Sequence, residues 1–247
     1  LHTSDPALDK VYDVCKWTLS ICRQSLHLDS PSHQELLACT GDYLVETNMT
    51  LFTFGDMRLA AQDIRRTADW LMENDGRMFH TSYSLMWVQW IRKVYTFTGD
   101  RALIRYCKDA LDTLLTRFHG YIGKNGILDN APDYMFVDWL EMEGYNMHHP
   151  PKSLGQTVLC AFYYKALTDA CALCKVMERE PDGAWWTAKR ASWASRMASF
   201  RPAFHRALYD AEAGLYIDGL SDEDEGDGWS RPKNVPLRHF TRHANVL

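Results

Sequence analysis

Residues 82–119 read SYSLMWVQWIRKVYTFTGDRALIRYCKDALDTLLTRFH. Apolar side chains recur at spacings of three and four through this stretch, which is the pattern of amphipathic helices. Only Gly99-Asp100 interrupts the pattern. Glycine favours the left-handed residue that follows a helix, and aspartate favours the N-cap of the next helix. The stretch therefore predicts a helical hairpin with a tight turn at Gly99-Asp100.

The same pattern extends over most of the chain. A second pair, Gly55-Asp56, predicts another tight turn, and segments with strand-like alternation are few and short. We expect seven helices, with an eighth beginning near residue 239. Their expected ranges are 6–26, 41–54, 56–74, 82–98, 100–119, 153–179 and 184–208. The fold class is therefore predicted to be all-α.

The connections between the expected hairpins are of another kind. Asp75-Gly76, Asn125-Gly126 and Ala213-Gly214 each follow the second helix of a pair and predict a turn that leads into a short extended segment. Long insertions are expected at about residues 120–152 and 208–238. Alternating tight and long connections are typical of a toroid of paired helices, with a functional site on the side of the long loops. The period of about 34 residues that marks a tetratricopeptide superhelix is not visible.

An (α/α)6 toroid of helical hairpins is therefore the predicted architecture. The expected helices fall short of six hairpins, and the chain stops at Asn245-Val246-Leu247 inside an expected helix. We predict that residues 1–247 form one incomplete domain, roughly the N-terminal two-thirds of the barrel, within a longer protein.

Composition narrows the choice of partners. The 247 residues are 46% hydrophobic and 13% aromatic, which is enough for a sizeable core. A net charge of -5, with the basic residues scattered, argues against a nucleic-acid partner. No run of about 18 apolar residues suggests a membrane span, and the first residues do not resemble a signal peptide. The chain has nine Trp and twelve Tyr. Their aromatic faces suit the apolar faces of sugar rings, and the alternative is that they fill a large core.

The cysteines indicate the cellular compartment in which the protein is expected. The chain has seven cysteines, an odd number, and most of them stand among the apolar positions of expected helices. This predicts buried free thiols rather than a disulfide framework. This favours a cytoplasmic protein, although a secreted or periplasmic one stays open because the chain does not begin with Met. The cysteines expected to be buried are Cys15, Cys22, Cys160, Cys171 and Cys174.

Residues 29–42 read DSPSHQELLACTGD and carry three carboxylates, Asp29, Glu35 and Asp42. The proline predicts a loop that enters a helix. If Thr40 caps that helix, Asp42 lies in its first turn, where the helix dipole favours an ionised carboxylate, while Glu35 lies deeper in the loop. Such different environments let one carboxyl act as an acid beside a charged neighbour. Spacing alone leaves open that the two aspartates only cap and that Glu35 is solvated.

The stretch resembles the signature of the inverting α-L-rhamnosidases, a family of six-hairpin glycosidases, which runs approximately DCPQRDERLGWTGD. The resemblance implies that Glu35 is the general acid, and that Asp29 and Asp42 hold the sugar and tune the site. His33 stands in place of an Arg and Cys39 in place of a sugar-contacting Trp, and both changes bear on which sugar is bound. The residues in register are Asp29, Pro31, Glu35, Leu37, Thr40, Gly41 and Asp42.

Weaker similarity covers nearly all of the remaining chain. Tyr83 falls where the family commonly has an active-site Trp, and Asp138-Trp139 resembles a Gly-Asp-Trp segment whose Trp lines the sugar subsite. A loop anchor packed on the barrel is the alternative for Trp139. The segment Arg242-His243-Ala244-Asn245 resembles the start of the next inner helix. The resemblance implies a carbohydrate substrate, no organic cofactor and no metal, with flanking β-domains and a barrel continuation.

Hydrolysis with inversion requires a second carboxyl group about 6.5–9.5 Å from the acid, with room for water between them. In the family this general base is a Glu from a later inner helix, which would lie beyond residue 247. Asp133, Glu141 and Glu143 in the long loop are the alternatives within the chain.

The sequence thus predicts a hydrolase that removes terminal α-L-rhamnose, or a related deoxy-sugar, from glycosides. A toroid enzyme acting on uronic acids and a non-catalytic helical carbohydrate-binding or scaffold protein are the alternatives. Three other motifs are assigned structural roles: Cys171 and Cys174 pack in a core, His148-His149 forms a rigid loop, and the acidic run 222–227 is solvated.

Overall fold

The computed structural model describes residues 2–30, 32, 39–129, 131, 136–137, 141–142, 145–146, 152–220 and 238–246. At residues 141–142, 145–146 and 152–154 it describes the backbone alone. Several predicted features therefore lie outside the described residues or have no described side chain. They are His33, Glu35, Asp133, Asp138, Trp139, Glu141, Glu143, His148-His149 and the acidic run 222–227.

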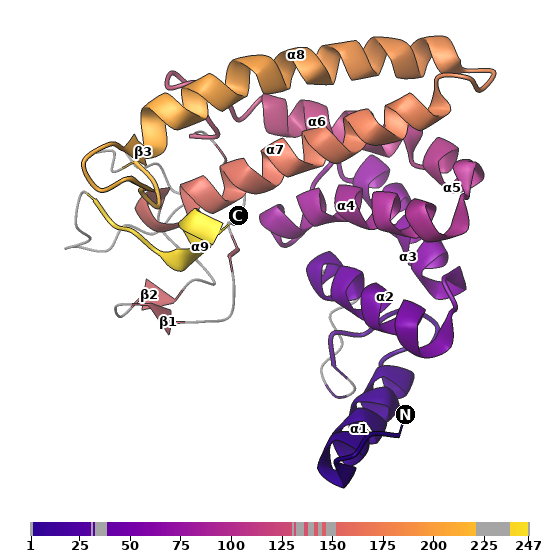
Figure 1. Ribbon diagram of the computed structural model, residues 1–247. Helices are drawn as coiled ribbons and strands as arrows, with labels where there is room; N and C mark the ends of the chain where they lie inside the picture. Colours follow the sequence, from indigo (N-terminus) through magenta and orange to yellow (C-terminus); the bar gives the residue numbers. More distant parts are fainter. Residues whose placement is uncertain are drawn as a thin grey trace.

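Helices dominate the described residues (Figure 1). The two short antiparallel hairpins are β1–β2, at Glu141–Met142 and Tyr145–Asn146, and β3–β4, at Tyr209–Asp210 and Leu215–Tyr216. The helices are α1 (Pro6–Ile21), α2 (Thr40–Phe54), α3 (Arg58–Glu73), α4 (Thr81–Thr98), α5 (Arg101–Tyr106), α6 (Lys108–His119), α7 (Lys152–Met177), α8 (Gly183–Leu208) and α9 (Arg242–Val246).

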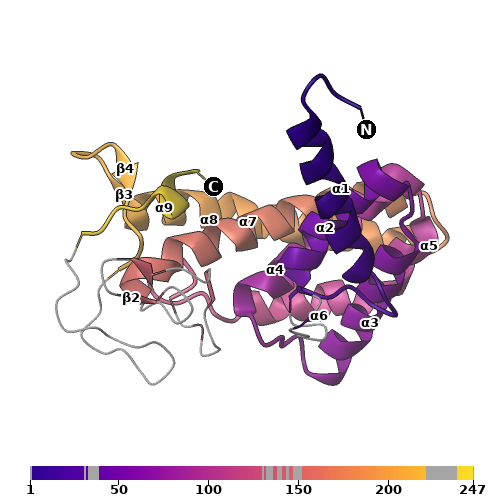
Figure 2. The same cartoon turned by 90° about the horizontal axis from the view of Figure 1, so that it is seen from below.

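The helices form two layers. Helix α4 packs between α2 and α7, and α9 packs on α7, so these four form the inner layer. Figures 1 and 2 show α2, α4 and α7 side by side. In the outer layer α3 packs on α6, and α8 lies along α7. Each tight turn follows an inner helix, so the longer connections all lead to the N-terminal ends of inner helices.

The two Gly-Asp turns differ in how the next helix begins. Gly55 and Gly99 both adopt the left-handed conformation, with φ of 66° and 67°, as predicted. Asp100 caps α5, because its carboxylate accepts the Leu103 N–H at 3.0 Å. The prediction for Asp56 was wrong, since the N-cap of α3 is Met57. Asp56 instead accepts the backbone and side-chain N–H groups of Arg58.

Two predicted helix ranges also need correction. The helix expected at 6–26 ends at Ile21, and the chain then turns back so that the Leu28 N–H donates to the Cys22 carbonyl at 2.9 Å. The helix expected at 100–119 is interrupted at Cys107, which separates α5 from α6. Gly214, with φ of 69°, leads into β4, as its turn motif predicted.

The core lies between the two layers. Four fully buried tryptophans, Trp87, Trp90, Trp186 and Trp193, contribute to it, so part of the high aromatic content fills the core. Helix α7 runs through the centre, and its segment Gly155–Met177 is long and apolar enough by composition to cross a membrane. Its burial between neighbouring helices accounts for that composition.

All seven cysteines are free thiols. Cys22, Cys160 and Cys174 are buried, as predicted. The prediction was wrong for Cys15, which is exposed on α1, and too strong for Cys171, which is only partly buried. The Cys171 thiol contacts the Arg190 carbonyl of α8, consistent with a packing role for this pair.

Candidate active site

The N-terminal turns of the inner helices meet at one cavity of about 340 Å³. Because helix N-termini carry partial positive charge, this end of each helix favours an ionised carboxylate such as Asp42. The cavity is lined by Gly41, Asp42, Leu44 and Val45 of α2, Tyr83 and Met86 of α4, Val137 of the segment between α6 and α7, Val158 and Phe162 of α7, and His243 and Val246 of α9.

The start of α2 is fitted closely to the start of α4. The Thr40 hydroxyl donates to the Tyr83 carbonyl at 2.6 Å. A Cβ atom added to Gly41 would lie 2.7 Å from the Tyr83 ring and 2.9 Å from the Met86 sulfur. Only glycine therefore fits here without displacing Tyr83. The expectation that Thr40 caps α2 was wrong, because Cys39 is the N-cap residue and makes no side-chain capping bond.

The structure places two of the predicted site residues at the cavity. Asp42 lies in the first turn of α2, as expected, and Tyr83 forms part of the wall. The Tyr83 ring packs edge-to-face on His80, at 5.2 Å, and on Phe136, at 5.0 Å. Aromatic neighbours of this kind hold the ring in one orientation.

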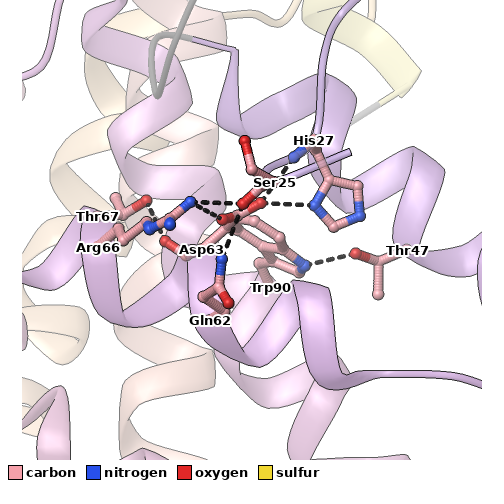
Figure 3. Close-up of polar contacts among 8 residues, drawn as sticks. All are labelled: Ser25, His27, Thr47, Gln62, Asp63, Arg66, Thr67 and Trp90. Atoms are coloured by element: carbon pink, nitrogen blue, oxygen red, sulfur yellow. Dashed lines mark hydrogen bonds and ion pairs between the residues drawn. The ribbon is translucent and has the colours of Figure 1, made fainter. Parts of the chain in front are cut away.

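Asp29 follows a loop that is anchored to α3 through Asp63 (Figure 3). The buried Asp63 carboxylate accepts the His27 backbone N–H at 2.8 Å and pairs with the His27 ring at 2.9 Å. Arg66 reaches both Asp63 and the Ser25 carbonyl. The His27 ring in turn stacks on Tyr43 of α2. These contacts fix the end of the loop, and hence Asp29, against the inner layer.

The charges of Asp29 and Asp42 both act on Glu46, which the sequence analysis did not select. Glu46 is only 7% exposed. Burial, followed by the charges of Asp42 and Asp29, raises its pKa from 4.5 to about 8, while Arg23 opposes the shift. The spacing of four residues from Asp42 was the available signal, because it puts both side chains on one face of a helix.

His243 is a second residue that sequence reasoning missed as part of the site. It reaches the cavity from α9. The start of α9 is held by the buried Asp218, whose carboxylate accepts both the backbone N–H of Thr241, at 3.0 Å, and its hydroxyl, at 2.7 Å. His239 also pairs with Asp218. The resemblance of Arg242-His243-Ala244-Asn245 to the start of an inner helix could have pointed to His243, but the sequence analysis used it only to place the helix.

Comparison with known families decides what this scaffold is. Residues 1–225 match the model of the bacterial alpha-L-rhamnosidase six-hairpin glycosidase domain. The chain belongs to this family. The all-α, six-hairpin fold predicted from the sequence is thereby confirmed.

Solved structures agree with the rhamnosidase-family fold. The GH78 family rhamnosidase of Bacillus sp. GL1 superposes with a TM-score of 0.68 at 19% identity, over 88% of this chain and 22% of that one. The rhamnosidase from Klebsiella oxytoca with rhamnose bound gives 0.60 at 21% identity, over 88% and 42%. The chain thus spans less than half the length of either protein. Comparison with curated proteins by sequence gave no match.

The rhamnosidase-family domain has another cavity, of about 390 Å³, between α7 and α8. Its lining contains Lys165 and Arg201 but, among the described residues, no carboxylate that could donate or accept a proton. The cavity at Asp42 is therefore the better candidate for glycoside chemistry. Within the described residues, no group of three His, Cys, Asp or Glu side chains is arranged to hold a metal ion.

Proposed function

We propose that the protein is a glycoside hydrolase that removes terminal α-L-rhamnose, or a related deoxy-sugar, with inversion. One observation carries the proposal: in a chain of the rhamnosidase family, Asp42 and Tyr83 line a single cavity at the N-terminal ends of the inner helices. A carboxylate beside an aromatic wall suits a sugar, whose hydroxyl groups donate hydrogen bonds and whose ring has an apolar face.

The lining favours a deoxy-sugar over a uronic acid. Apart from Asp42 and His243, the described lining carries no ionisable side chain except the Tyr83 phenol, and no Lys or Arg that could pair with a uronate. A methyl group at the same position of the sugar gains from apolar neighbours. Those neighbours are Leu44, Val45, Met86, Val158, Phe162 and Val246.

Each candidate residue takes one role in the proposed reaction. Glu35 donates its proton to the departing glycosidic oxygen, and a second carboxylate on a later inner helix removes a proton from the attacking water. Asp29 and Asp42 hold the sugar hydroxyl groups. Tyr83 supports one face of the ring, with Trp139 as a second aromatic wall and with His33 and Asp138 as further contacts to the sugar.

The test is turnover of aryl α-L-rhamnosides by the native protein and its Glu35→Gln variant. Loss of general acid catalysis costs about 10²–10⁴-fold. The loss is expected to be greatest with a poor leaving group and smaller with an activated one, because an activated leaving group needs less protonation. Glu73→Gln, at an exposed carboxyl on the outer helix α3, is the matched control and is expected to match the wild type.

Equal turnover by wild type and Glu35→Gln would contradict the role of Glu35. A panel that includes aryl uronides separates the two sugar classes. Faster turnover of a uronide than of the rhamnoside would overturn the proposed specificity but retain the glycosidase assignment. Binding of L-rhamnose without turnover of any aryl glycoside would favour a carbohydrate-binding protein instead.

A further inference from the structure

Glu46 occupies an unusual position for a carboxyl group. It lies on α2 one helical turn after Asp42, so both side chains are on the same face. More than nine-tenths of the residue is buried, and its Oε2 atom has no hydrogen-bond partner in the part of the chain that the structure describes. Burying a carboxylate with one oxygen that accepts no hydrogen bond is disfavoured, so this geometry favours the neutral acid.

Charged groups from three other segments act on the same carboxyl. Asp29 comes from the loop before α2, and Asp63 comes from α3, where it is already paired with His27 and Arg66. Arg23, just after α1, is the cation whose charge opposes these acids among the described residues. Arg23 also pairs with Asp56 at 3.5 Å, so its charge is shared.

The electrostatic balance agrees with the packing. Burial is the largest cause of the rise in the Glu46 pKa to about 8, and Asp42 and Asp29 add to it. The neighbouring Cys22 thiol also has a raised pKa, because it is buried and faces Glu46 and Asp29. The thiol is therefore not a base that would take the proton from Glu46 near neutral pH.

We infer that Glu46 is a positioning residue that carries a proton beneath Asp29 and Asp42, so that these two can face the sugar as carboxylates. The inference rests on the proposed function. With its proton in place, Glu46 adds no charge to the cluster. When the proton is lost, three carboxylates repel one another, and the loop carrying Asp29 is pushed away from the start of α2. Sugar binding and turnover are then lost on the alkaline side.

The first experiment needs no activity. Thermal unfolding of the native protein is followed from pH 5 to pH 9 for the wild type and for Glu46→Gln, which keeps the size of the side chain but cannot ionise. Because the folded pKa lies above the ordinary value, the stabilising effect is complete below about pH 4.5 and is lost as the pH rises to about 8. The unfolding temperature of the wild type should therefore fall relative to that of the variant.

Two further variants support this measurement. Glu73→Gln, at an exposed carboxyl, should follow the wild-type curve. Asp42→Asn removes one repelling charge and should shift the end of the wild-type decline to lower pH, which tests the inference even if Glu46→Gln does not fold. Parallel curves for all four proteins would overturn the inference.

The second experiment is the pH profile of kcat/KM with an aryl α-L-rhamnoside. The wild type should lose activity with an apparent pKa of about 8, and Glu46→Gln should lack this alkaline limb because it imitates the protonated acid. An unchanged alkaline limb in Glu46→Gln would overturn the positioning role. No rhamnoside turnover by the wild type, combined with the expected stability difference, would overturn the proposed function and still support a neutral Glu46.

Discussion

Gly41 shows how a single missing side chain shapes the cavity. The ring of Tyr83 and the sulfur of Met86 occupy the space that a Cβ atom would need. The preceding Thr40 ties the same two helices together through the Tyr83 carbonyl, and the following Asp42 faces the cavity. Three consecutive residues thus set the distance between helices, the position of an aromatic ring and the charge of the lining.

Gly41→Ala is expected to displace Tyr83 and to destabilise the fold by about 1–3 kcal/mol through overpacking. Turnover of the aryl rhamnoside should fall about tenfold or more, since the aromatic wall moves with the ring. Gly99→Ala is the control: its left-handed conformation also costs about 1 kcal/mol in alanine, but it lies in open space away from the cavity. Equal activity losses in both variants would show that stability, and not the fit at Tyr83, is responsible.

At this scale the sequence could predict the residue types but not their contacts. Asp42 was correctly expected in the first turn of α2. The hydroxyl of Thr40 was assigned to the cap, because a sequence pattern shows only local partners and the actual acceptor lies 43 residues away. The same limit explains why Glu46 was missed, since its properties depend on Asp29, Arg23 and Asp63 from other segments.

Among the elements, the turn between α1 and residues 29–42 most directly positions the candidate site. Apolar Leu19, Cys22 and Leu26 keep the spacings of three and four residues that are typical of a helix, and the sequence therefore predicted helix to residue 26. The pairing of His27 with Asp63, 36 residues away, stabilises a turn instead. Long-range pairing of this kind overrides local helix propensity.

Asp63→Asn is expected to weaken this turn. The variant removes the charge that interacts with the His27 ring and Arg66, at a cost of about 1–3 kcal/mol for hydrogen bonds to a buried charged group. The unfolding temperature should fall accordingly, and sugar binding should weaken because Asp29 follows the turn. Asp69→Asn on the exposed face of the same helix should cost less than about 1 kcal/mol. Similar losses in the two variants would argue against Asp63 as the anchor.

For the whole molecule, the cavity is built from residues that are far apart in the chain. Asp42 and His243 line it together although about 200 residues separate them. The periodicity and the Gly-Asp turns were sufficient to predict paired helices, because both are local signals. Which helix starts converge depends on how the layers pack, and no local signal in one sequence reports that.

His243→Ala tests this convergence. Loss of one hydrogen-bonding side chain from the lining should raise the KM for the rhamnoside, or the Kd for L-rhamnose, about tenfold, with little change in unfolding temperature. Arg242→Ala, at the exposed neighbouring position of α9, should leave both constants unchanged. If the two variants bind L-rhamnose equally well, α9 does not contribute to the sugar site.

The tight turns at Gly55 and Gly99 lie at the ends of α2 and α4 that face away from the cavity. Val45 and Met86 are the last residues of α2 and α4 that line the cavity, so at about 1.5 Å per residue these turns lie roughly 15–20 Å from it. Both glycines stand in open space. A fluorophore or an affinity tag attached there would report on the barrel, or tether it to a surface, at a distance from the residues that line the cavity.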